Sequence, residues 1–312
     1  MFATAAALKA RGVLGLNQRN AQYISRYNPR RLYPLVDDKL RTKKLAAAAG
    51  IAVPELFGVI RMQAEIRDLH QLLSKYPDFV IKPAQGSGGE GVLVIAGRSN
   101  GLYRQVSGVL LNSFELEHHV SNILGGMYSL GGHPDKAMIE ARVGFDPIFE
   151  PICYLGVPDI RIIVFLGVPV MSMVRLPTRM SNGKANLHQG AIGAGISIAQ
   201  GRTLKAVWRN QIIADHPDTG KAVSNIQIPQ WEGLLQLAAR SYELTGLGYQ
   251  GIDIVLDRDR GPLILELNAR PGLNIQIANG CGLLPRLQLI EGSCRSLQSA
   301  AARVEFARRS FS

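Results

Sequence analysis

The segment 251–268 constrains the fold of this chain most strongly. Two apolar runs, 251–256 and 262–268, are joined by the linker DRDRG, whose residues favour a turn. Strands joined by so short a linker pair as an antiparallel hairpin. The chain is therefore predicted to contain an antiparallel sheet.

Polar side chains interrupt both strands of this hairpin. Pairing across the turn places Asp253 opposite Glu266, and the two-residue repeat of a strand puts Asn268 on the same face as Glu266. Three oxygen donors on one sheet face suit Mg²⁺, which shares its coordination shell with phosphate oxygens. The alternative, two carboxylates on a solvated face, stays open at this point.

A second hairpin is predicted from 159–166 and 170–176, around Gly167. Its expected register places Arg161 opposite Arg175. Like charges that face each other across a sheet are destabilising unless an anion lies between them, and a polyphosphate would supply that anion. The alternative is that both arginine side chains extend into water.

The strand DFVIKP carries Lys82 and runs into a glycine-rich loop. Backbone N–H groups of such a loop approach phosphates closely because no Cβ intrudes, and the lysine supplies positive charge. The loop leads into another strand, VLVIAG, so it matches neither a Walker A motif nor a dinucleotide-binding fingerprint. A flexible turn is the alternative. The candidate loop residues are Gly86, Ser87, Gly88, Gly89 and Gly91.

The rest of the chain mixes helices and strands. Helices are predicted over 37–49, ending at Gly50, and over 63–75, 102–124 and 231–245, with an amphipathic helix in the last twenty residues. The loop KANLHQGA gathers Lys184, Asn186 and His188 and suits a phosphate or substrate contact, although His188 alone is more typical of a structural loop histidine. The pattern indicates an α+β protein.

Composition excludes several classes of protein. With 312 residues, 46% hydrophobic and 19% charged, the chain is neither a disulfide miniprotein nor disordered. Cys153, Cys281 and Cys294 are widely spaced, and no Ser/His/Asp or Cys/His pattern indicates a catalytic nucleophile. No signal peptide is recognised, and no apolar run reaches the roughly 20 residues of a membrane span. We therefore expect a cytoplasmic protein.

Positive charge is concentrated at the N-terminus. Residues 1–44 contain ten Lys and Arg against two acids, which accounts for +8 of the net charge of +11. A basic arm over 1–36 would dock an acidic acceptor, a partner protein or a sister subunit, whereas a solvated face is the simpler interpretation. Few aromatic residues lie among these charges, so nucleic-acid binding is not favoured.

Taken together, these segments resemble the ATP-grasp superfamily, and within it the RimK-like α-L-glutamate ligases. The match runs from Asp37 to Leu273. Its segments follow the family's order: DDKLRTKKLAAAAGIAVPE, VIKPAQGSGGEGV, MIEARV, DIRIIVF, KANLHQGA, GIDIVLD and LILELNARPG.

The resemblance implies two α+β subdomains, 37–140 and 141–290, that clasp a nucleotide, followed by a C-terminal helix in 291–312. Only the basic segment 1–36 stands where RimK-like ligases usually carry a full N-terminal domain, so we expect that domain to be lacking here. Residue roles are also implied. ATP would be bound by Lys39, Lys82, the glycine-rich loop, Glu140, Ala141, Arg142, Asp159 and Lys184, with Glu150 as the alternative to Asp159 at the ribose.

The chemistry implied by the resemblance is ATP-dependent carboxylate–amine ligation through an acyl phosphate. Arg161, Arg175, Asn186 and Arg270 would contact the triphosphate or acyl phosphate, and Asp253, Glu266 and Asn268 would hold Mg²⁺, with Mn²⁺ as an alternative. The substrates would be glutamate or another amino acid and a peptide or small carboxylate acceptor. The alternatives are a nucleotide-binding regulatory or scaffold protein with a retired site, and a nucleic-acid binder that uses the basic arm.

Overall fold

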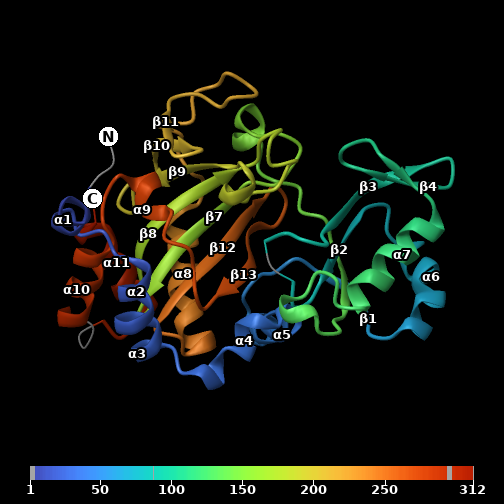
Figure 1. Cartoon of the computed structure of the whole chain (residues 1–312), viewed down its shortest axis with the longest axis horizontal. Coiled ribbons are helices and arrows are strands. Elements are labelled where there is room, and N and C mark those ends of the chain that lie inside the picture. Colours follow the sequence, from blue (N-terminus) through green and yellow to red (C-terminus); the bar gives the residue numbers. More distant parts are fainter. Residues whose placement is uncertain (1–3, 87, 294–296, 312) are drawn as a thin grey trace. The chain divides into compact units, whose positions relative to one another are not determined.

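The computed structural model describes residues 4–86, 88–293 and 297–311 and divides the chain into two compact units. Unit 1 comprises residues 1–37, 45–52 and 145–312, and unit 2 comprises residues 38–44 and 53–144. Each unit contains one antiparallel sheet with helices, so the α+β prediction is confirmed (Figure 1).

Unit 2 is built on a six-stranded sheet with the order β1-β6-β2-β3-β4-β5. Helices η3, α6 and α7 pack against this sheet, and its core includes Phe79, Ile81 and Ile139. The elements are β1 (Leu56–Ile60), η3 (Gln63–Asp68), α6 (Leu69–Leu73), β2 (Phe79–Pro83), β3 (Leu93–Ser99), β4 (Leu102–Gln105), β5 (Leu110–Leu111), α7 (Ser113–Leu124), η4 (Leu130–Gly132) and β6 (Ala137–Glu140).

Unit 1 is built on a seven-stranded sheet with the order β11-β10-β9-β8-β7-β12-β13. Helix α8 packs on β7, β8 and β12, and α9 on β8, β9 and β10. The strands are β7 (Asp159–Phe165), β8 (Val168–Leu176), β9 (Ile192–Ile196), β10 (Thr203–Trp208), β11 (Gln211–Ile213), β12 (Tyr249–Asp257) and β13 (Gly261–Asn268). The main helices are η5 (Pro147–Ile152), η6 (Leu187–Gln189), α8 (Trp231–Thr245), α9 (Ile275–Asn279), α10 (Leu284–Ser293) and α11 (Ala300–Ser310).

The predicted helices are confirmed except in one region. Helix α5 (Lys39–Ala48) stops before Gly50, which adopts the positive φ that favours glycine. The segment predicted as one helix over 102–124 instead forms β4 and β5 before α7. The reason is a capping box at Asn112, whose side chain accepts from the N–H of Glu115 while the Glu115 carboxylate accepts from the N–H of Asn112, so the helix starts there.

The expected register of the β7–β8 hairpin is wrong. Arg175 lies opposite Asp159, and Arg161 lies opposite Met173. Leu166 and Gly167 both have positive φ and form a two-residue turn, and Val170 is then left unpaired as a bulge. An arginine therefore faces a carboxylate, and no bound anion is needed to stabilise the pair.

The N-terminal segment is folded against unit 1 rather than extended as an arm. It forms short helices: α1 (Ala5–Ala10), α2 (Leu16–Gln18), η1 (Arg19–Ile24, a π-helix), α3 (Ser25–Tyr27), η2 (Arg30–Leu32) and α4 (Pro34–Asp37). The Tyr23 ring packs edge-on against Phe165 of β7, and the Asn28 side chain donates to the Tyr249 carbonyl oxygen of β12. Within the described residues, no helix is long and apolar enough to cross a membrane.

Candidate functional site

Six polar residues share one face of the unit 1 sheet, across the neighbouring strands β8, β7, β12 and β13. The register places Asp253 opposite both Arg161 and Glu266, and Asp159 opposite Arg175. Strand alternation then puts all six on one face. We call them the charged row: Asp159, Arg161, Arg175, Asp253, Glu266 and Asn268. The predicted pairing of Asp253 with Glu266 is confirmed.

Two arginine forks join the aspartates of the charged row. Arg161 donates from Nε and Nη2 to the two oxygens of Asp253, at 2.7 and 2.5 Å. Arg175 binds Asp159 through both Nε and Nη2, and its Nη2 also donates to Asp253 Oδ2 at 2.9 Å. Planar guanidinium groups make such paired hydrogen bonds to carboxylates, which fixes the side chains in one arrangement.

Burial makes the electrostatics of the charged row strong. The Asp253 side chain is 4% exposed, and those of Arg161 and Arg175 are 13% and 12% exposed. Burial alone would raise the pKa of Asp253, but the two guanidinium groups outweigh it and lower the pKa to about 2. Burial raises the pKa of Asp159, which shares Arg175 with Asp253. Asp253, which is held by two cations, therefore has the lower pKa of the two aspartates.

The donor chemistry of the charged row fits a hard cation. Asp253 and Glu266 are carboxylates and Asn268 is an amide, which are ligand types of Mg²⁺. In this arrangement Asn268 Nδ2 donates to Asp253 Oδ2 at 3.3 Å, and a half-turn of the amide would present its oxygen instead. In the described part of the chain, the charged row included, no group of three or more His, Cys, Asp or Glu is arranged to hold a metal.

Three other predicted phosphate contacts lie in the segments that follow strands of unit 1. Lys184 and Asn186 lie in the loop after β8, where the Asn186 side chain accepts from the N–H of His188. Arg270 is exposed, two residues past Asn268, and its guanidinium lies 5.2 Å from the centre of the Tyr33 ring. Arg270 is thus two residues from a member of the charged row in the sequence, whereas Lys184 and Asn186 lie in a separate loop.

The two ribose candidates differ in environment. Asp159 is 6% exposed and is bound by Arg175. The Glu150 side chain is 57% exposed and pairs with Arg258 at 3.2 Å. Glu150 is therefore the more accessible of the two.

A second buried ionic group lies in unit 2 and is centred on Glu140. Its carboxylate forms ion pairs with Lys82 of β2 and, at 2.9 Å, with Lys43 of α5. Burial alone would raise the pKa of Glu140, but the two ammonium groups lower it below its ordinary value. Glu140 thus holds two cations in place, and Lys43 is a member of this group that the sequence analysis counted only among the basic residues.

The glycine-rich loop is anchored at its base. Lys39 Nζ donates to the Gly86 carbonyl oxygen, and the buried Asp135 accepts from the N–H of Gln85 at 2.8 Å. Gly88, Gly89 and Gly91 adopt positive φ, as a loop of this kind requires. Ser87 lies outside the described residues. Asp135 was missed because a lone aspartate before an apolar strand carries no motif.

Two predicted adenine contacts follow β6. The Ala141 N–H donates to the Glu55 carbonyl oxygen at 2.8 Å, and Arg142 pairs with Asp78 at 3.2 Å.

Among the cysteines, burial raises the pKa of the Cys153 thiol to about 12, so this thiol is not an activated nucleophile.

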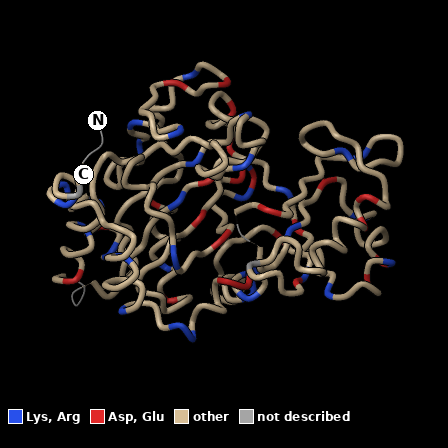
Figure 2. Tube along the Cα trace, in the orientation of Figure 1, with Lys and Arg blue, Asp and Glu red and all other residues tan. Residues whose placement is uncertain are grey.

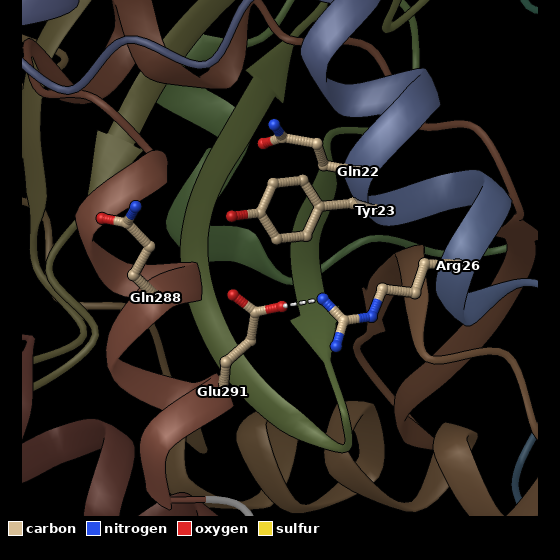
Figure 3. A pocket seen from close by; sticks show the side chains of 5 residues that line it. All are labelled: Gln22, Tyr23, Arg26, Gln288 and Glu291. Carbon is tan, nitrogen blue, oxygen red and sulfur yellow. Dashed lines mark hydrogen bonds and ion pairs between the residues drawn. The ribbon is translucent and has the colours of Figure 1, made fainter.

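A separate cavity of about 350 Å³ lies beside the N-terminal segment in unit 1 (Figure 3). Gln22, Tyr23 and Arg26 line it on one side, and Gln288 and Glu291 of α10 on the other. No member of the charged row lines this cavity. Figure 2 shows that acidic and basic residues lie among the strands of the large sheet, where the charged row lies.

A family model described as sugar-transfer associated ATP-grasp matches residues 18–292. The chain belongs to this ATP-grasp family. The resemblance inferred from the seven segments is thereby confirmed, as is the ATP-grasp fold class. Among curated relatives, the probable alpha-L-glutamate ligase of Pseudomonas putida (strain GB-1) is 24% identical over 244 residues, which cover 78% of this chain and 59% of the relative.

A further relative matches at a similar identity, and the solved ATP-grasp structures match at lower identity. The probable alpha-L-glutamate ligase of Xanthomonas axonopodis pv. citri is 25% identical over 79% of this chain and 60% of its own length. This ATP-grasp chain thus spans about six tenths of these relatives. A D-alanine–D-alanine ligase from Bacillus anthracis matches with a TM-score of 0.47 and 14% identity over 88% of this chain and 71% of its own. The D-cycloserine synthetase DcsG matches with a TM-score of 0.45 and 18% identity over 90% of this chain and 73% of its own.

Proposed function

We propose that this ATP-grasp chain is a carboxylate–amine ligase. ATP transfers its terminal phosphoryl group to a substrate carboxylate, an amine attacks the acyl phosphate, and the products are an amide, ADP and phosphate. The observation that carries this proposal is the charged row, which gathers cationic forks and oxygen ligands on one sheet face. Phosphoryl transfer needs positioning and charge stabilisation more than a protein nucleophile.

The charged row divides into anion-binding and cation-binding members. Arg161 and Arg175 would turn from the aspartates to phosphate oxygens, since guanidinium forks fit both groups. Asp253, Glu266 and Asn268 would hold Mg²⁺, or Mn²⁺ in its place. The metal ion would screen the negative charge of the phosphates.

In unit 2, Lys82, Lys39 and the glycine-rich loop would contact phosphates, since lysine ammonium groups and loop N–H groups attract them. Because the Ala141 N–H is already bonded, the adenine edge would meet the Ala141 carbonyl and the Arg142 backbone. Lys184 and Asn186 would add phosphate contacts in unit 1. For the ribose, accessibility favours Glu150, and Asp159 would hold Arg175 in place while no phosphate is bound.

The substrate assignment uses the names of the relatives. The curated relatives are called probable alpha-L-glutamate ligases, so glutamate is the first amine to test. The family description associates its members with sugar transfer, so carboxylates borne by sugars join acidic peptides as acceptors to test.

The decisive experiment measures Mg²⁺-dependent release of ADP and phosphate with each amino acid, alone and with acidic peptides or sugar acids. Release that one amino acid stimulates, and that Glu266→Ala abolishes, supports the ligase. Glu232→Ala is the matched control, because Glu232 is an exposed glutamate of α8 paired with Arg308 at 2.9 Å. No release under any condition, although MgATP raises the melting temperature, would favour the retired-site alternative.

A further inference from the structure

Arg19 is a buried cation for which the described chain provides no carboxylate partner. The residue is 7% exposed. Its guanidinium donates to the Pro271 carbonyl oxygen at 2.6 Å and to the Asn20 side-chain oxygen at 3.1 and 2.9 Å. Both acceptors are neutral. A buried charge is costly unless an opposite charge compensates it, so this arginine is poised for an anion.

A second arginine stands beside Arg19. Pro271, which accepts from Arg19, directly follows Arg270. Arg270 is exposed, packs on the Tyr33 ring, and makes no ion pair within the described part of the chain. Burial lowers the pKa of Arg19 and the charge of Arg270 lowers it further, while Tyr249 opposes this, so the two guanidinium groups repel each other. An anion between them would relieve that repulsion.

The segments that carry the two arginines are fixed to one another. The Asn28 side chain donates to the carbonyl oxygens of Tyr249 and Ala269, at 2.6 and 2.9 Å, and accepts from the Tyr249 N–H at 2.9 Å. It thereby bridges β12 and the end of β13 just beyond their last pair, Gly251 and Asn268. Arg19 also begins a π-helix, a rare element that is frequent at functional sites.

We propose that Arg19 joins Arg270 in binding an oxyanion of the substrate, either its carboxylate or the phosphoryl group that the carboxylate carries after activation. The family resemblance already implies an acyl-phosphate contact for Arg270, and the new element is the contribution of Arg19. Guanidinium forks suit both groups. The site begins two residues past Asn268, so an oxyanion held there lies at the strand end that carries the candidate metal ligands. The N-terminal basic segment thus contributes a substrate contact to unit 1. The identity of the anion rests on the proposed ligase function, whereas the existence of the site does not.

The test uses the full chain without ATP. Acetate or inorganic phosphate is titrated against chloride at constant ionic strength, and binding is followed as the rise in melting temperature. Both probes are expected to stabilise the wild type, and the apparent affinity should fall at least tenfold in Arg19→Gln and in Arg270→Gln. Arg26→Gln is the matched control, because Arg26 lies on the same segment but is exposed and pairs with Glu291 at 3.5 Å (Figure 3).

The same experiment separates an anion site from a purely structural arginine. Without added anion, Arg19→Gln should melt at or above the temperature of the wild type, because the repulsion of Arg270 is removed. Arg19→Lys keeps the charge but not the fork and should retain part of the anion effect. A preference for acetate identifies the substrate carboxylate, and a preference for phosphate identifies the phosphoryl group. Anion stabilisation that Arg19→Gln leaves unchanged, or its absence in the wild type, would overturn the proposal. Neither result depends on ADP release.

Discussion

Unit 1 and unit 2 each bury a carboxylate between two cations, but they do so with different chemistry. Glu140 in unit 2 is held by the lysines Lys82 and Lys43, and Asp253 in unit 1 by the arginines Arg161 and Arg175. Both carboxylate side chains are 4% exposed. Burial is therefore the same in both, and the comparison isolates the cations and the charge balance.

The charge balance has opposite sign in the two groups. The Glu140 group has two cations for one carboxylate, so it keeps a surplus of positive charge. The charged row has two arginines for the three carboxylates Asp159, Asp253 and Glu266, so it keeps a surplus of negative charge. The first balance suits a phosphate and the second suits a metal ion. Unit 2 thus has the electrostatics to attract an anion, and unit 1 has those to attract a cation.

The largest expected effect follows from removing the charge of Asp253. Asp253→Asn leaves two buried guanidinium groups without their shared carboxylate, and we expect the free energy of unfolding to fall by about 4 kcal/mol. Urea unfolding measures it. The matched control is Asp257→Asn, because Asp257 is a buried aspartate of the same strand but pairs with the partly exposed Arg260. Equal losses of unfolding free energy in the two variants would show that a carboxylate bound by two arginines stabilises the protein no more than one bound by a single arginine.

A smaller effect is expected at the corresponding position of unit 2. Glu140→Gln leaves two ammonium groups, but their flexible stems let them move toward water, so we expect a loss of about 2–3 kcal/mol. The double variant Glu140→Gln/Lys43→Met should recover part of that loss, because one of the repelling cations is removed. A double variant less stable than the single one would contradict the assigned role of Lys43.

Short-range patterns predicted much of the charged row. The pairing of Asp253 with Glu266 followed from a short linker, and Asn268 followed from strand alternation. The pairing of Arg175 did not follow, because one bulge residue, Val170, sets the register and nothing in its sequence marks it. Partners distant in sequence were missed because no local pattern predicts long-range contacts. Lys43 contacts Glu140, and Arg19 contacts Pro271, only in the folded chain.

The pH dependence of stability should differ between the two groups. Both pKa values are lowered by folding, so each carboxylate stabilises the protein above its unfolded pKa and loses that contribution as the pH falls through its folded pKa. Starting from ordinary values of 4.5 for Glu140 and 3.8 for Asp253, the Glu140 contribution begins to fall first. The Asp253 contribution, about 2 kcal/mol, disappears as the pH approaches about 2.

This order is measured as the difference in unfolding free energy between the wild type and each variant. As the pH is lowered, the difference in unfolding free energy between the wild type and Glu140→Gln should start to decrease near pH 4.5. The difference between the wild type and Asp253→Asn should start to decrease near pH 3.8. If both differences stayed constant down to pH 3, the predicted loss of stabilisation on protonation of the two carboxylates would be wrong.

The smallest effect on stability is expected at Lys39, a cation of unit 2 that lies outside the Glu140 group. Lys39 donates to the Gly86 carbonyl oxygen at the base of the glycine-rich loop. Lys39→Gln should change the free energy of unfolding by no more than about 0.5 kcal/mol, because the lysine is partly exposed. Nucleotide binding should weaken a few-fold, since one positive charge is lost beside the loop. Lys44→Gln, an exposed lysine of the same helix, is the control. If both variants weaken MgATP binding equally in calorimetry, the effect comes from net charge alone and the anchored loop is not the phosphate contact.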